Sequence, residues 1–341
     1  MRKSNLVRIV LILPAILVMG TSFGQKKEKR LAKKYAHDSN YYEMLPNKVT
    51  GRFYVGQKSA HVFIPSNNGS KDINYEANHK VNVGFGVTHH NYSLNVGYGL
   101  SAINTNTKLK GKTKGFDFQF HLYPHKWAVD LMLVMPKGMY IDPKGYGNGN
   151  PSAYYFRSDI KERLLGVAAY KVPNKEKFSY RAAIVQNEWQ KKSAGSVLYG
   201  GELYYGSLQG DSALVPSKIQ AGFPQAGMTK MRYFSVGPGV GYAFTLVANK
   251  HFYFMASLIG NIKLNMVTES FPSGDIKNTS IAPSAILKTG IGYNSDNWSF
   301  GGSLTGNGLW IKGKSSTNNY YLPSGMFRVQ VAKKFDTHKK K

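Results

Sequence analysis

His121 and Asp130 are the two residues whose types and spacing could support catalysis in this sequence. They lie in two alternating segments joined by a short turn. A hairpin that pairs Phe120 with Leu131 would set His121 opposite Asp130 on one face. An imidazole oriented by a carboxylate can serve as general base for a serine nucleophile, as in membrane-embedded lipases. The alternative is a hydrogen-bonded pair that fixes strand register, which we favour because the sequence places no nucleophile beside them.

Other catalytic and cofactor motifs are absent from the sequence. Neither G-x-S-x-G nor H-E-x-x-H occurs. Gly237, Gly239 and Gly241 lack the spacing and the following helix of a dinucleotide fingerprint. The chain has no Cys, which excludes disulfides, thiolate catalysis, Cys-zinc sites and iron–sulfur clusters. We therefore expect no metal and no cofactor.

The elements that must position these residues are strands with a period of two. In 234–246, large apolar residues such as Phe234, Val240 and Leu246 share one parity, and glycines and small polar residues share the other. The candidate strands are 50–63, 80–88, 92–100, 115–123, 127–135, 160–172, 178–188, 196–206, 231–247, 251–264, 281–293, 298–305 and 326–335. Many exceed the five or six residues usual in soluble sheets and approach the roughly 9–11 residues that cross a bilayer.

The connections between these strands alternate between short and long. Tight turns are expected at 89–91, 124–126, 173–175, 248–250 and 294–296. Long polar stretches are expected at 101–114, 136–159, 207–229, 265–280 and 306–324. Short turns on one side and long loops on the other are typical of an outer-membrane barrel. The small parity then faces inward, because a narrow interior must be filled by side chains or kept small where strands curve.

The sequence thus predicts an all-β fold, an antiparallel transmembrane β-barrel with a small or plugged lumen. Bacterial barrels have even strand numbers, so we expect about 12 strands, with 14 possible. Twelve would follow if the segment 50–63 were a plug or a periplasmic segment. Polar residues on the inferred inward parity could line a pore or neutralise one another in a closed interior, and we favour closure. They are Asp117, Gln119, Asp130, Arg181, Glu202, Lys263, Lys288 and Arg328.

The two ends of the chain predict export and flexible tails. Residues 1–24 have a basic start, an apolar run and a small-residue cleavage site, which indicates a signal peptide. Residues 25–48 are expected to be a flexible basic periplasmic segment, 49–335 the barrel and 336–341 a basic tail. The formal charge is +27. In an exported protein this favours anionic lipopolysaccharide headgroups of outer-membrane lipid as partners and disfavours nucleic acid.

Three stretches carry a resemblance to a known family. They are "NHKVNVGFGVTHHNYSLNVGYG" (78–99), "KLKGKTKGFDFQFHLYPHKWAVDLMLVMPKGMY" (108–140) and "KFSYRAAIVQNEWQKKSAGSVLYGGELYYGSL" (177–208). They resemble an uncharacterised domain-of-unknown-function family of outer-membrane β-barrels of the Gram-negative Bacteroidota. The most specific part is the string Gln190, Lys191, Lys192, Ser193, Ala194, Gly195 and Ser196, which we expect at a turn. Lys191, Lys192 and Ser193 either contact a lipid phosphate or a partner there, or only form the turn. The resemblance implies fold and location but no activity.

Three functions are compatible with these observations. The preferred one is a non-enzymatic outer-membrane barrel with a structural, adhesive or narrow-conduit role, inserted by the barrel-assembly machinery. The second is a barrel enzyme acting on lipid through His121 and Asp130. The third is a small diffusion channel.

Overall fold

The computed structural model describes residues 37–67, 69–78, 81–99, 107–124 and 126–337, without the side chains of Phe116 and Asp117. Ser39–Lys341 forms one compact unit, to which the following description refers. The predicted signal peptide and the first half of the predicted flexible segment, 25–36, lie outside the described residues. No helix in the described ranges has the length and apolar character needed to cross a membrane.

The unit is almost entirely β-structure. Its strands are β1 (Tyr42–Met44), β2 (Lys48–Ile64), β3 (Ile73–Glu76), β4 (Asn82–His89), β5 (Tyr92–Gly99), β6 (Lys114–Leu122), β7 (Trp127–Asp142), β8 (Tyr155–Lys171), β9 (Glu188–Gln190), β10 (Ala194–Gln209), β11 (Lys230–Ala248), β12 (Phe252–Phe271), β13 (Gly274–Asn294), β14 (Trp298–Ile311) and β15 (Tyr320–Asp336). The helical elements are α3 (Thr107–Lys110), α4 (Tyr180–Ile184) and the 3-10 helix η1 (Ser217–Gly222).

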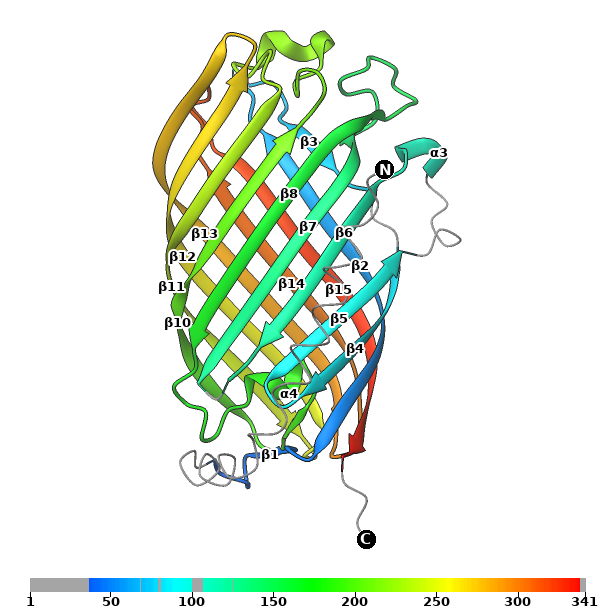
Figure 1. Ribbon diagram of the computed structural model, residues 1–341, viewed down its shortest axis with the longest axis vertical. Helices are drawn as coiled ribbons and strands as arrows, with labels where there is room; N and C mark the ends of the chain where they lie inside the picture. Colours follow the sequence, from blue (N-terminus) through cyan, green and yellow to red (C-terminus); the bar gives the residue numbers. More distant parts are fainter. Residues whose placement is uncertain (1–36, 68, 79–80, 100–106, 125, 338–341) are drawn as a thin grey trace, which may run out of the picture. The chain divides into compact units, whose positions relative to one another are not determined.

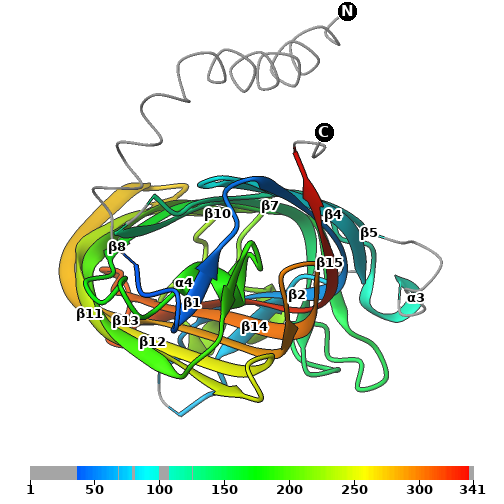
Figure 2. The ribbon, with the colours of Figure 1, turned by 90° about the horizontal axis from the view of Figure 1, so that it is seen from below.

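The long strands close into an antiparallel ring. The order of the main sheet runs from β15 down to β10, then β8, β7, β3, β2, β4, β5 and β6, and further pairings join β15 to β2 and β6 to β7. Because β3 only bridges the far ends of β2 and β7, twelve strands remain in the ring (Figures 1 and 2). The predicted antiparallel barrel of about 12 strands is confirmed.

The twelve strands are not quite the expected ones. The segment 50–63 lies in the wall as β2, whereas 178–188 is not a wall strand. Its residues form α4 and the start of β9, and β9 pairs with β1 instead of with the ring. Ser179 begins the helix, since its Oγ accepts a hydrogen bond from Ala182 N at 3.0 Å. Phe178 and Tyr180 are both buried in a cluster inside the barrel. Their spacing of two residues is the same as on the apolar face of a strand, which is why the sequence pattern predicted a strand here.

The connections follow the predicted asymmetry with two exceptions. Short turns join β4 to β5, β6 to β7, β11 to β12 and β13 to β14 at the end where α4 lies (Figure 1). The expected turn at 173–175 instead opens the longer connection that contains α4. At the opposite end, the expected long loop 265–280 is the tip of a hairpin, because β12 and β13 pair as far as Phe271 and Gly274. Polar residues there alternate without a continuous apolar face, so periodicity does not indicate a strand in this stretch.

Large apolar side chains cover the outer face of the ring. Val240 is 61% exposed, Leu258 61%, Ile262 66% and Ile291 62%. The inward parity of β11 carries Gly237, Gly239 and Gly241. A Cβ on Gly237 would lie 2.0 Å from Ile262 O. The small inward face is therefore required by the close approach of β11 and β12.

The barrel interior contains two apolar clusters. The upper cluster lies at the long-connection end, where Val62, Ile73 and Ile141 from strands meet Leu214 and Phe223 from the connection between β10 and β11. The lower cluster lies at the short-turn end and packs Phe178, Tyr180 and Val185 of the α4 region against Tyr170 and Tyr253 of the wall. Both ends of the lumen are therefore occupied by packed side chains.

Candidate functional site

A polar layer separates the two clusters, and His121 and Asp130 belong to it. The register of β6 and β7 pairs His121 directly with Asp130. His121 Nδ1 lies 2.6 Å from Asp130 Oδ1, and the two side chains are 15% and 21% exposed. This is the contact by which a carboxylate orients an imidazole in hydrolytic sites.

The Asp130 carboxylate has further partners. Tyr123 OH donates a hydrogen bond to Asp130 Oδ1 at 2.6 Å. Lys288 Nζ donates to Asp130 Oδ2 from β13, on the far side of the lumen. Both carboxylate oxygens are thus engaged and the charge is compensated by a lysine. Such an arrangement holds two walls together and leaves little capacity to stabilise a second positive charge on His121.

A second ion pair lies between β10 and β12. Lys263 Nζ contacts Glu202 Oε2, and the two side chains are 0% and 1% exposed. The same ammonium group lies 4.0 Å from the ring centroid of Tyr204. A buried charge pair of this kind is stable only when its partners are both present.

Gly239 makes room for a polar contact across the lumen. A Cβ at Gly239 would lie 1.8 Å from Asn261 Oδ1. That oxygen accepts a hydrogen bond from Tyr170 OH at 2.5 Å, which links β12 to β8. The glycine is therefore needed for the position of the asparagine as well as for the curvature of the wall.

Gln119 of β6 and Arg328 of β15 meet in the interior, although these two strands are not neighbours in the ring. Arg328 Nη2 donates to Gln119 Oε1 at 3.3 Å, and its guanidinium lies 4.2 Å from the ring centroid of Tyr54. The Asp117 side chain, which was expected to face the lumen, lies outside the described part of the structure.

A cavity of about 130 Å³ lies within this polar layer. His121, Asp130, Lys288, Gln119 and Arg328 line it together with Lys58, which sequence reasoning did not single out. Ser303, Thr305 and Ser324 also line it. The volume is enough for a few water molecules or one small polar group.

Arg181 is a predicted lumen-facing residue whose position in the structure differs from the expected one. It lies on α4 and not on a wall strand. Its Nη1 donates to Asn91 Oδ1 at 2.9 Å and lies 3.3 Å from Glu188 Oε1. Arg181 therefore fixes the α4 segment to the turn between β4 and β5 and does not line an open lumen.

The string from Gln190 to Ser196 joins this segment to the barrel rim. The Gln190 side chain accepts from Ser179 N at 2.8 Å and donates to the carbonyl oxygens of Lys177 at 2.7 Å, Lys192 at 3.0 Å and Tyr41 at 3.2 Å. One amide group thus holds β1, the start of α4 and the following turn together.

The other residues of this string make local contacts. Lys191 Nζ lies 2.9 Å from Glu43 Oε2. Ser193 Oγ accepts from Val247 N at 2.9 Å, and Ser196 Oγ accepts from Asn174 N at 3.1 Å. Ala194 and Gly195 are the first residues of β10. Every one of these contacts is explained by the architecture of the turn.

Two titratable groups beside α4 are shifted by burial. Burial lowers the pKa of the Lys175 amino group to about 8. Burial, together with the charge of Glu188, raises the pKa of Tyr42 above its ordinary range. Tyr42 OH donates to the carbonyl oxygen of Lys175 at 2.7 Å. The packing that closes this end of the barrel therefore limits the contact of the Lys175 amino group with water.

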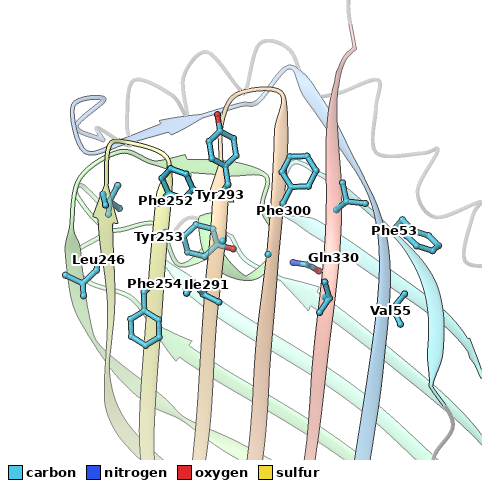
Figure 3. Close-up of a pocket in the computed structure, with 16 residues that line it drawn as sticks. Phe53, Val55, Leu246, Phe252, Tyr253, Phe254, Ile291, Tyr293, Phe300 and Gln330 are labelled. Atoms are coloured by element: carbon cyan, nitrogen blue, oxygen red, sulfur yellow. The ribbon is translucent and has the colours of Figure 1, made fainter.

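The outer wall has a concave apolar surface near the short-turn end. Its volume is about 930 Å³, and it extends across β11 to β15 and β2. Phe252, Phe254, Ile291 and Phe300 project along it (Figure 3). The exposed fractions of Phe252 and Phe300 are 56% and 48%. Contact between such a large apolar surface and water is unfavourable.

Sequence reasoning missed several interior polar groups. Tyr123 shares the inward parity of His121, so its hydrogen bond to Asp130 could have been inferred from the hairpin register. Arg52 donates to Ser93 Oγ at 2.6 Å and to the carbonyl oxygen of Val185 in the α4 region. No local pattern predicts that contact. Within the described ranges, no group of three His, Asp or Glu residues could hold a metal ion.

Comparisons with known proteins give a family for this chain and distant likenesses to solved structures. The family model described as Domain of unknown function (DUF4421) matches residues 36–335. No curated protein matches the sequence. The outer membrane protease OmpT from Escherichia coli is 8% identical, with a TM-score of 0.41 over 85% of this chain and 97% of that chain. Neisserial surface protein A is 13% identical, with a TM-score of 0.23 over 83% and 97%.

Proposed function

This chain belongs to the family described as Domain of unknown function (DUF4421), and we propose that it is a bacterial outer-membrane β-barrel with a closed interior. Its role is structural or adhesive, and it conducts no solutes. The family description supplies no activity, so the proposal rests on the geometry of the chain itself.

The outer face of the ring supports a membrane location. Large apolar side chains such as Leu258 and Ile262 of β12 and Val329 of β15 project outward with exposed fractions of 61%, 66% and 53%. Aromatic side chains gather near the short-turn end, where Trp298 stacks on Phe300 at a centroid distance of 5.9 Å. An apolar band with aromatic residues at its edge is the outer surface that a bilayer requires.

The filled lumen is the main observation that supports a closed barrel. The upper cluster contains Leu214 and Phe223 from a connecting segment, and the lower cluster contains Phe178 and Tyr180 from the α4 region. Between them the polar side chains are paired, as in Lys263 with Glu202 and Lys288 with Asp130. A water-filled channel would need an uninterrupted polar path between the two ends, and packed apolar side chains at both ends oppose it.

The test combines location with conductance. The mature protein should fractionate with outer membranes, and the purified barrel should give no stepwise current in planar bilayers. Insertion is verified in the same preparation by the shift in gel mobility between unheated and heated samples. Recovery of the protein in the soluble periplasmic fraction would contradict the membrane location, and regular current steps would contradict closure.

A lipid-acting enzyme is the second candidate. It is favoured by the 2.6 Å contact between His121 Nδ1 and Asp130 Oδ1 and by Ser303, Thr305 and Ser324 in the adjacent cavity. The test is ester hydrolysis or acyl transfer with phospholipid substrates. His121→Ala should abolish any activity and His251→Ala should not. Activity that survives His121→Ala would remove this pair from the mechanism.

A further inference from the structure

Four basic residues lie together on the outer face of β6, β7 and β8. Register pairs Lys114 with Lys137 and Lys137 with Lys161, and Arg163 follows Lys161 on the same face of β8. We call Lys114, Lys137, Lys161 and Arg163 the outer basic patch. The three strands run side by side in Figure 1.

The outer basic patch is costly for the isolated protein. Directly opposed residues of neighbouring strands have Cβ atoms about 5 Å apart, and like charges at that separation repel. Within the described ranges, Lys161 alone has an ion-pair partner, Asp211 Oδ1 at 3.9 Å, and these side chains are 38% and 73% exposed. An exposed pair at that distance compensates little of the charge.

The position of the outer basic patch indicates which groups compensate its positive charge. On β7, the outward series changes from Leu131 and Leu133 to Lys137, and on β8 it changes from Leu165 to Arg163 and Lys161. On each strand the basic residues lie farther from the short turn between β6 and β7 than the leucines do, with Arg163 at the middle of β8 and Lys114 at the start of β6. The patch therefore borders the apolar band on the side of the long connections.

We infer that the outer basic patch binds the phosphate groups of an anionic amphiphile whose acyl chains lie against the neighbouring apolar wall. This inference rests on the proposed membrane location. Arginine binds phosphate through paired donors and lysine as a point charge. A multiply phosphorylated lipid headgroup matches four clustered cations better than a zwitterionic headgroup does, and Leu133 and Leu165 offer its chains an apolar surface.

The test compares headgroups on the purified full-length barrel. The probes are diphosphoryl lipid A, monophosphoryl lipid A, phosphatidylcholine and inorganic pyrophosphate, and affinity is measured by titration in a neutral detergent. We expect diphosphoryl lipid A to bind tightest and pyrophosphate weakly. Each of Lys137→Gln and Lys161→Gln should weaken binding of lipid A about fivefold. Lys171→Gln, at the other end of β8, is the matched control and should leave the affinity unchanged.

Thermal stability supplies a second readout, because the substitution should change the unfolding temperature differently without lipid and with lipid. Without lipid, Lys137→Gln should keep or raise the unfolding temperature, because it removes repulsion from both neighbouring lysines. With saturating diphosphoryl lipid A, the same variant should gain less stability than the unmodified protein. Equal affinity of all variants for lipid A, or pyrophosphate binding as tight as lipid A, would overturn the inference. Neither result would alter the fractionation and conductance that test the proposed function.

Discussion

Lys288 on β13 donates a hydrogen bond across the lumen to Asp130 on β7. These two strands are not neighbours in the sheet. The ion pair therefore connects opposite walls that share no backbone hydrogen bonds. His121 and Tyr123 complete the set of donors around the same carboxylate.

Lys288→Met should destabilise the barrel. The substitution leaves Asp130 charged in the interior without its cation, which typically costs about 3 kcal/mol. Asp130→Asn combined with Lys288→Met should cost clearly less than the two single changes together, because no unpaired charge remains. Guanidinium unfolding in detergent micelles measures each value, with the exposed Lys277→Met as control. Strict additivity of the two changes would contradict a coupled pair.

Gly239→Ala should impair folding of the barrel. The new Cβ would lie 1.8 Å from Asn261 Oδ1, so the asparagine must abandon its bond from Tyr170 or the two strands must separate. Gly260→Ala on the adjoining β12 is the matched control, because nothing lies within 4 Å of a Cβ there. The yield of the heat-modifiable form after refolding should fall for Gly239→Ala only. Equal yields for both variants would show that the wall tolerates a side chain at Gly239.

Gln190→Ala should release the α4 segment while the ring stays intact. The change removes the amide that bonds Ser179, Lys177, Lys192 and Tyr41. Trypsin should then cut near Lys177 and Arg181 at a higher rate, since local opening exposes them. Lys192→Gln, which keeps the amide contacts, is the control for a simple change of surface charge. Unchanged cleavage would mean that packing of Phe178 and Tyr180 suffices to hold the segment.

Lys175 should make stability depend on pH. Its pKa is about 8 in the folded protein, below the value of about 10.4 expected in the unfolded chain. Between these two values the unfolded chain binds more protons, so its contribution to stability rises as pH increases through this window. Guanidinium unfolding at pH 7.5, 9 and 10 should reveal this rise. Lys175→Met should reduce the slope, whereas Lys126→Met in the short turn between β6 and β7 should keep it.

The wall strands could be predicted from the sequence because they alternate large apolar residues with small or polar ones. Val236, Val240 and Leu246 indicate the outer face of β11 directly. The same argument anticipated that His121 and Asp130 face each other, since hairpin register follows from a short turn. The inward lysines, Lys263 and Lys288, were also found by parity.

The α4 segment could not be predicted in this way. Phe178 and Tyr180 have strand-like spacing. The contacts that hold the α4 segment come from distant residues such as Asn294, whose side chain donates to the Ala182 carbonyl oxygen at 3.0 Å. The partners of Asp130 and Asn261 across the lumen were missed for the same reason. Parity gives the direction of a side chain but not which residue of the opposite wall it meets.

The pairing of β2 with β15 has a consequence for truncated chains. Tyr321 to Asp336 lie against Phe63 to Lys48, so the earliest and latest wall segments must find one another over nearly the whole polypeptide. A premature stop codon before Tyr320 would leave two unsatisfied sheet borders, one on β2 and one on β14. Such a product would be a substrate for quality-control proteases before it reached its destination.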